Sequence, residues 1–291
     1  MNAPATAALQ SILPAATTIG TATLRVADAD RSLRWYRDMM GLELIERMSD
    51  RILLGAGGKT FLTLEVRPDA PPRDESTTGL YHIAILVPDH PSLAGVLARI
   101  AAAGVRLGAS DHRVSEALYI WDPDNNGLEI YRDRRRDEWT WDGKRVRMAT
   151  DPLDLRNLLA DSAGRERAPM PAGTRVGHVH LQVGDLAKAK TFYCDVLGFE
   201  QTAGRGGALF VSAGGYHHHV GLNTWHSLNG PPPAENAAGL VIFEIVVPDR
   251  AALLPLKDRL RAAGYATVDD GDGFRVRDPW GTAIRVLAPS L

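Results

Sequence analysis

The residues most able to do chemistry are histidines that lie in strand-like text. His82 and His178 each stand in an apolar segment, and His180 shares a strand face with His178, because alternate strand residues face the same way. A run of three histidines follows at His217–His219. Imidazole binds divalent transition metals and exchanges protons near neutral pH. The sequence therefore favours metal binding or acid–base chemistry. The alternatives are ordinary buried histidines and, for the run, a solvated cluster.

The elements that must position these histidines repeat along the chain. Four strand-like segments each end in Val, at Ile19–Val26, Tyr81–Val87, Val176–Val183 and Val241–Val247. Each is followed by an Asp, an amphipathic helical pattern and a Gly suited to a helix C-cap. The first and third copies contain WYRDMMGLE and FYCDVLGFE, and the second and fourth contain RIAAAGV and RLRAAGY before an Asp-Pro turn. The order is A-B-A-B, as in a duplicated pair.

A single copy cannot bury both faces of its sheet, so the copies must pair. A charged, Pro-containing stretch interrupts the repeats, with a short helix expected around Leu153–Leu159. We expect an α+β fold of four βαβββ modules. The first pair of modules spans residues 1–131, a connector spans 132–173, and the second pair spans 174–291.

The text GHVHLQVGDLAKAKTFYCDVLGFE, set in these repeats, resembles the vicinal-oxygen-chelate superfamily of glyoxalase I, bleomycin-resistance proteins and extradiol dioxygenases. The resemblance extends from about Thr18 to the end of the chain. It is closest to bacterial catechol 2,3-dioxygenase-like proteins, which carry YHHHVGLNTW and VRMATDPLDL as this chain does. It implies that the modules pair into two open barrels and that strand residues hold a divalent metal.

The resemblance implies ligand positions on the first and last strands of a module. The first-strand position holds Thr21, His82, His178 and Ile242 in the four copies, and the last-strand position holds Glu129 and Arg285 in the B copies. Only the second and third copies keep ligand residues, so His82, Glu129 and His178 are the expected metal ligands. Two imidazoles and one carboxylate form the set that binds Fe(II) in non-haem oxygenases, and Mn(II) suits the same donors.

This ligand set requires the second module to lie against the third. Pairing in chain order would leave His82 and Glu129 in one barrel and His178 in the other. We therefore predict that the second module pairs with the third, and the first with the fourth, within one chain. A swapped dimer would also bring the ligands together, so a homo-oligomer is the alternative.

The resemblance also implies catalytic roles. Tyr119 matches a tyrosine that hydrogen-bonds the bound substrate in that family. The alternative is an ordinary aromatic residue of a strand, which would give the same sequence pattern. Alignment with the His-x-Val-Ala-Phe pattern of extradiol enzymes selects His218 as the acid/base, with His219 as the second choice. If the run is a strand, His218 points away from His217 and His219.

These features together imply an extradiol dioxygenase that uses dioxygen to open a catechol- or hydroquinone-type ring. One alternative is a glyoxalase-like isomerase or lyase, which usually keeps a second carboxylate ligand that this chain does not obviously supply. The other is a non-catalytic protein that binds a drug or quinone, because two of the four copies have lost their ligands.

Composition narrows the remaining classes. The net charge of −2, with acids and bases interspersed, argues against a nucleic-acid or anionic-membrane partner. No apolar stretch is long enough to span a bilayer. The single cysteine, Cys194, excludes an intrachain disulfide and fits a reducing compartment. The segment from Met1 to Thr18 lacks signal-peptide features, so we expect a cytoplasmic protein.

Overall fold

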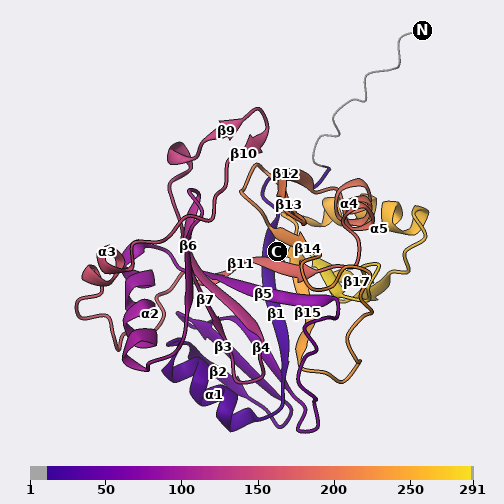
Figure 1. Ribbon diagram of the computed structural model, residues 1–291. Coiled ribbons are helices and arrows are strands. Elements are labelled where there is room, and N and C mark those ends of the chain that lie inside the picture. The colour runs from indigo at the N-terminus through magenta and orange to yellow at the C-terminus, as the bar shows by residue number, and fades with distance from the viewer. Residues whose placement is uncertain (1–11, 290–291) are drawn as a thin grey trace.

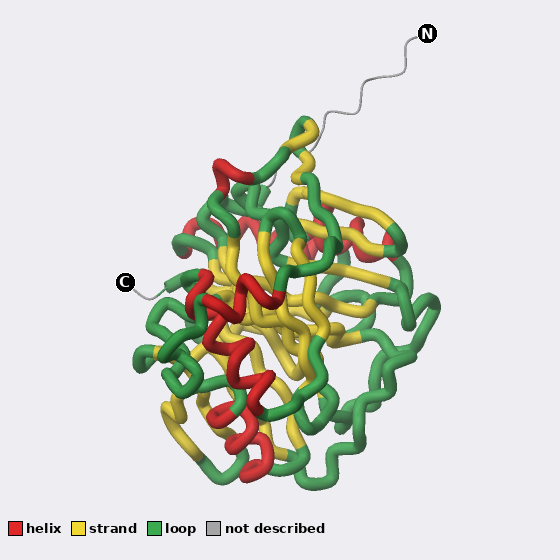
Figure 2. The backbone as a smooth tube through the Cα atoms, turned by 60° about the vertical axis from the view of Figure 1, so that its left-hand side comes forward, coloured by secondary structure: helices red, strands yellow, loops and turns green. Residues whose placement is uncertain are grey.

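Two curled eight-stranded β-sheets form the centre of the structure, a computed structural model that describes residues 12–289 (Figure 1). The helices lie outside the strands (Figure 2). The α+β class with paired βαβββ modules is confirmed. Within the described residues, no helix combines the length and the apolar character that crossing a bilayer needs.

Each sheet takes one module from either half of the chain. The first sheet runs, in spatial order, β16 (Val268–Asp270), β17 (Gly273–Arg277), β18 (Ala283–Leu287), β15 (Gly239–Val246), β1 (Thr18–Val26), β4 (Lys59–Val66), β3 (Arg51–Ala56) and β2 (Glu43–Arg47). The second runs β12 (Glu200–Arg205), β13 (Ala208–Ser212), β14 (Val220–Asn223), β11 (Arg175–Gln182), β5 (Gly79–Leu86), β8 (Gly127–Asp133), β7 (Ser115–Trp121) and β6 (Gly108–Asp111). The central joints are the antiparallel pairs β1–β15 and β5–β11. The second module therefore lies against the third.

The Asp after each first strand caps the helix that follows it. The helices are α1 (Ala29–Asp38), α2 (His90–Ala102), α4 (Leu186–Lys190) continued by the π-helical η2 (Thr191–Val196), and the 3-10 turn η3 (Arg250–Ala252) leading into α5 (Leu253–Ala262). Asp28, Asp89, Asp185 and Asp249 each accept a backbone N–H from the first turn. The glycines that end these helices, Gly41, Gly104, Gly198 and Gly264, all have positive φ. Local sequence thus determines the strand–helix units.

The connector contains more structure than the sequence predicts. It holds the 3-10 turn η1 (Arg136–Glu138), a hairpin of β9 (Trp141–Asp142) and β10 (Arg145–Val146), and α3 (Leu155–Ala160). The helix lies close to its expected position, and the hairpin was not expected. The hairpin projects from the body of the molecule in Figure 1, and β10 contacts β12. The connector therefore reaches both modules of the second sheet.

One buried hydrogen bond recurs in both halves and ties the sheets together. The Tyr36 hydroxyl of α1 donates to Asp122 in the turn before β8, at 2.9 Å. The matching Tyr193 hydroxyl donates to Asp278 before β18, at 3.1 Å. In each case the helix belongs to one sheet and the turn to the other. Burial raises the pKa of Asp122, although Asn126 and Tyr36 donate hydrogen bonds to it.

Replacement of Tyr36 by Phe should lower the free energy of unfolding by about 1–3 kcal/mol, because Asp122 would lose a donor inside the protein. Denaturant titration measures this change. Tyr265→Phe is the matched control, because the Tyr265 hydroxyl bonds to none of the residues from 12 to 289, and it should cost much less. Equal losses in the two variants would contradict this role for Tyr36.

Candidate metal centre

Three adjacent strands of the second sheet bring His82, Glu129 and His178 together. Glu129 of β8 lies beside Ala84 of β5, and Ala84 lies opposite His178 of β11. His82 is two residues before Ala84 on the same face of β5. The pairing of β5 with β11 is therefore what joins the third module's histidine to the second module's histidine and carboxylate. The small side chain of Ala84 leaves room between them.

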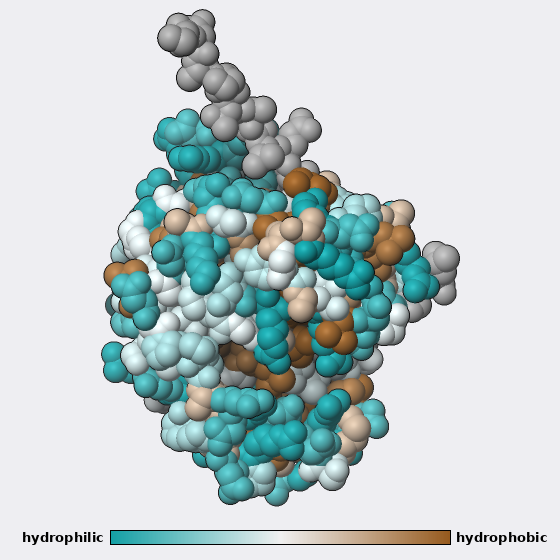
Figure 3. All heavy atoms as spheres, turned by 90° about the vertical axis from the view of Figure 1, so that its right-hand side faces the viewer, coloured by the Kyte–Doolittle hydropathy of each residue, from teal (hydrophilic) through white to brown (hydrophobic). Residues whose placement is uncertain are grey.

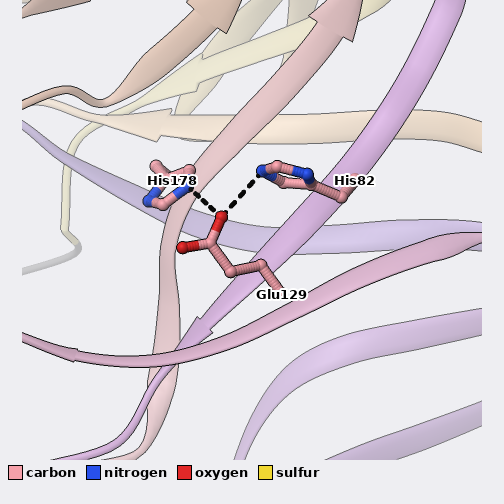
Figure 4. A group of neighbouring side chains, drawn as sticks. All are labelled: His82, Glu129 and His178. Carbon is pink, nitrogen blue, oxygen red and sulfur yellow. Dashed lines mark hydrogen bonds and ion pairs between the residues drawn. The ribbon is translucent and has the colours of Figure 1, made fainter. Parts of the chain in front are cut away.

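The three side chains converge on one carboxylate oxygen (Figure 4). The Oε2 atom of Glu129 lies 2.9 Å from His82 Nε2 and 3.1 Å from His178 Nε2. One donor atom from each residue lies within 4.8 Å of the other two. All three side chains are buried, with at most 6% of the residue exposed. Among the described residues, this is the group of histidine, cysteine and acidic side chains with metal-site geometry.

The electrostatics of this group suit a cation. Burial lowers the pKa of His178 to about 4, which keeps the imidazole neutral at pH 7. Burial raises the pKa of Glu129, but the two neighbouring imidazoles outweigh it and hold the pKa well below its usual range. The Nε2 atom of His82 is buried and lacks a well-aligned hydrogen bond to any described residue, despite its short distance to Glu129. A divalent ion would satisfy that nitrogen and the carboxylate charge together.

Two residues of the cluster, His82 and Glu129, line a cavity of about 710 Å³. Val146 and Met148 of the connector and Phe210 of β13 also line it. A mixture of apolar walls and a few convergent polar groups is typical of a small-molecule site.

Tyr119 lines this cavity and lies directly opposite Glu129 in the β7–β8 pair. Its hydroxyl is 2.6 Å from His112 Nε2, and His112 Nδ1 is 2.6 Å from the Ala149 carbonyl oxygen. Since that carbonyl can only accept, His112 donates from Nδ1, and in this tautomer its Nε2 accepts from the Tyr119 hydroxyl. Burial and the Glu129 charge raise the pKa of Tyr119 well above its usual value. His112 was not predicted as a site residue, because no repeat or motif in the sequence marks it.

The histidine run adopts a different conformation from the expected strand. Residues 217–219 precede β14, and the rings of His217 and His218 lie side by side with their Nδ1 atoms 2.8 Å apart. The alternating orientation predicted for His217 and His218 is therefore wrong, because extended strand geometry begins only at Val220. His218 lines the cavity, and its ring centroid lies 4.0 Å from that of His178.

His219, the second choice for the acid/base, lies away from the cavity lining. Its Nδ1 accepts from the Ala213 backbone N–H at 3.2 Å and lies 3.0 Å from Ser212 Oγ. These contacts hold the loop before β14, which favours a structural role for His219. His180 does line the cavity, and its Nε2 accepts from Asn223 Nδ2 at 3.1 Å. Its ring covers Gly221, where a Cβ would lie 2.8 Å from the ring.

The corresponding positions of the first sheet hold an ion pair. Arg285 of β18 lies 2.8 Å from Glu244 and 2.6 Å from Asp272. Glu244 also accepts the Thr21 backbone N–H at 2.9 Å. At the position of a metal ligand, Arg285 supplies a positive charge. This charge neutralises the neighbouring carboxylates in place of a metal ion.

This chain belongs to the Glyoxalase/Bleomycin resistance protein/Dioxygenase superfamily, whose family model matches residues 18–130 and 175–286. The two matched segments correspond to the two halves of the duplicated chain. Over 269 residues, covering 90% of this chain and 94% of the relative, it is 44% identical to a catechol-2,3-dioxygenase of Bacillus subtilis (strain 168).

Solved structures share the fold at low sequence identity. A Bacillus subtilis protein described as a candidate dioxygenase superposes with a TM-score of 0.66 at 16% identity, over 93% of this chain and 84% of that chain. Glyoxalase I from Zea mays superposes with a TM-score of 0.56 at 16% identity, over 94% and 92% of the two chains. These likenesses support the architecture, and the site itself must be argued from its residues.

Because several histidines are buried, the free energy of unfolding should decrease in acid. Burial lowers the pKa of His219 to about 3, from 6.5 when unfolded, so the unfolded chain binds more protons between these values. The free energy of unfolding should therefore fall as the pH drops below about 6.5, and His219→Gln should remove about 1 kcal/mol per pH unit from that slope. Urea titrations over this range measure it. His226→Gln, at an exposed position, is the control and should keep the slope of the parent protein. An unchanged slope in His219→Gln would contradict the assignment.

Proposed function

We propose that this protein is an extradiol ring-cleaving dioxygenase that holds Fe(II), or Mn(II) in its place, on His82, Glu129 and His178. The observation that carries the proposal is the convergence of two imidazoles and one carboxylate, with donor atoms within 4.8 Å, where His82 and Glu129 line the cavity. The 44% identical relative supports the same chemistry. Three protein donors leave coordination positions open, as substrate activation at such a metal requires.

When bound, the metal would supply the redox chemistry that joins dioxygen to the ring carbon beside a diol. The chain supplies geometry, charge and proton transfer. The carboxylate of Glu129 offsets part of the metal charge, and the neutral ring of His178 offers a lone pair because burial keeps its pKa near 4. They stand on β8 and β11, the two strands that flank β5 in a single sheet, which limits their movement relative to each other.

Tyr119 and His218 would act on the hydroxyl groups of the substrate. Tyr119 donates a hydrogen bond to His112, so a lone pair of its oxygen can accept a hydrogen bond from a substrate hydroxyl in the cavity. His218 lines the cavity beside His178, where a neutral imidazole can take up a substrate proton and return it later. We propose a catechol-type diol as substrate, with Val146, Met148 and Phe210 contacting its ring.

Oxygen consumption tests the activity directly. The anaerobically purified, iron-loaded protein should consume one dioxygen per catechol and form a ring-opened product with strong visible absorbance. An oxygen electrode and mass spectrometry of the product measure this. A glyoxalase-like isomerase would instead convert its substrate without oxygen uptake, and a binding protein would retain the catechol unchanged. Either result, across a panel of catechols and hydroquinones, would contradict the proposal.

Metal retention tests the ligand assignment separately. Glu129→Gln and His82→Ala should each reduce bound iron at least about tenfold after gel filtration, because each removes one of three ligands. Elemental analysis measures this. Glu46→Gln, an exposed position on β2 of the other sheet, is the matched control and should retain iron like the parent. Full iron content in Glu129→Gln would refute its role as a ligand.

A further inference from the structure

A chain of buried hydrogen bonds leads from the cavity to one carboxylate that the functional proposal does not use. The Nδ1 atom of His218 lies 2.8 Å from His217 Nδ1, and His217 Nε2 lies 2.9 Å from Asp133 Oδ1. Asp133 ends β8, the strand that also carries Glu129. His217 is fully buried, whereas the Asp133 side chain is 25% exposed, which lets solvent stabilise its charge.

A second branch reaches the same carboxylate. The Tyr216 hydroxyl donates to Asp133 Oδ2 at 2.9 Å and lies 2.8 Å from the Tyr131 hydroxyl. Tyr131 in turn packs its ring against His178, with centroids 4.8 Å apart. Gly177 makes room for this branch, because a Cβ there would lie 1.9 Å from the Tyr131 hydroxyl oxygen. Both branches thus begin beside the metal cluster and end on Asp133.

The directions in the first branch follow from Asp133 for a His217 ring that holds a single proton. A carboxylate can only accept, so that proton lies on Nε2. The lone pair on His217 Nδ1 then accepts from His218 Nδ1–H. His218 is left with its lone pair on Nε2. That nitrogen forms no hydrogen bond with any residue in the described part of the chain, and its ring lines the cavity.

We propose that Asp133, acting through His217, is a positioning residue that fixes the tautomer of His218, so that Nε2 faces the cavity as a proton acceptor. In other carboxylate–histidine pairs too, the carboxylate that binds one ring nitrogen determines which of the two nitrogens carries the proton. Here two imidazoles in series carry that effect. This inference rests on the proposed function only in one respect, namely that the His218 lone pair accepts a proton from the substrate.

The tautomer can be measured without any activity. In the full-length protein freed of metal by chelation, long-range ¹H–¹⁵N correlation spectra near pH 7.5 should show the His218 proton on Nδ1 and a lone pair on Nε2. Loss of signals in His218→Gln would identify the ring. Asp133→Asn should disturb this tautomer, because the new amide can donate to His217 Nε2 and reverse the chain. A proton on His218 Nε2 in the parent, or an unchanged tautomer in Asp133→Asn, would overturn the proposal.

Kinetics of the iron-loaded protein give the functional readout. Asp133→Asn should lower kcat on the order of 10- to 100-fold at unchanged iron content, with KM altered by less than about threefold. Asp137→Asn, at an exposed position paired with Arg135, is the control and should match the parent. A kcat for Asp133→Asn equal to that of the parent would contradict the proposal. If the parent itself consumes no oxygen with any diol, the proposed function fails, and the spectra still decide the tautomer.

Two substitutions of His217 separate bond direction from packing. In His217→Asn, the side-chain oxygen can take the place of Nδ1 and accept from His218, although the link to Asp133 is lost. In His217→Gln, the amide nitrogen can take the place of Nε2 and donate to Asp133, but no acceptor faces His218. The Asn variant should therefore keep several-fold more kcat than the Gln variant. Equal loss in both would assign His217 a packing role and overturn the proposal.

Discussion

The antiparallel pairing of β5 with β11 is the contact that brings the three candidate ligands together. It joins the second module to the third across a long separation in sequence, and it places His178 beside Ala84 in a row that also includes Glu129. A shift of one residue in that register would turn His178 to the other face of the sheet. Neither half of the chain contains all three donors, so the cluster exists only when this joint forms.

The two sheets are built from the same repeated module, but the charged side chains at their corresponding positions are neutralised in different ways. In the second sheet, two imidazoles and a carboxylate face each other with an unsatisfied buried nitrogen on His82. In the first sheet, Arg285 and Glu244 neutralise each other at the corresponding place. The first sheet still contributes stability, because the Tyr36–Asp122 and Tyr193–Asp278 bonds tie each helix to a turn of the other sheet.

Local patterns were enough to predict the strand–helix units. The first strands, the capping aspartates and the terminal glycines each depend on residues within one module, and the structure agrees with them. The spatial order of the modules could be argued only from the split ligand set. The predicted alternation of His217 and His218 was wrong, because these residues belong to a loop before β14 and not to a strand. The contact of Asp133 depends on His217 from another module, and His112 contacts Tyr119 of its own module and Ala149 of the connector. No sequence pattern indicated these contacts.

We propose that one divalent ion binds between the second and third modules. Crystallographic anomalous scattering at the iron edge, from crystals of the anaerobically loaded protein, tests this binding. One strong peak should lie within bonding distance of His82 Nε2, a Glu129 carboxylate oxygen and His178 Nε2 of the same chain. A peak elsewhere, ligands contributed by two different chains, or iron-loaded crystals with no ordered peak at this cluster would contradict the proposal.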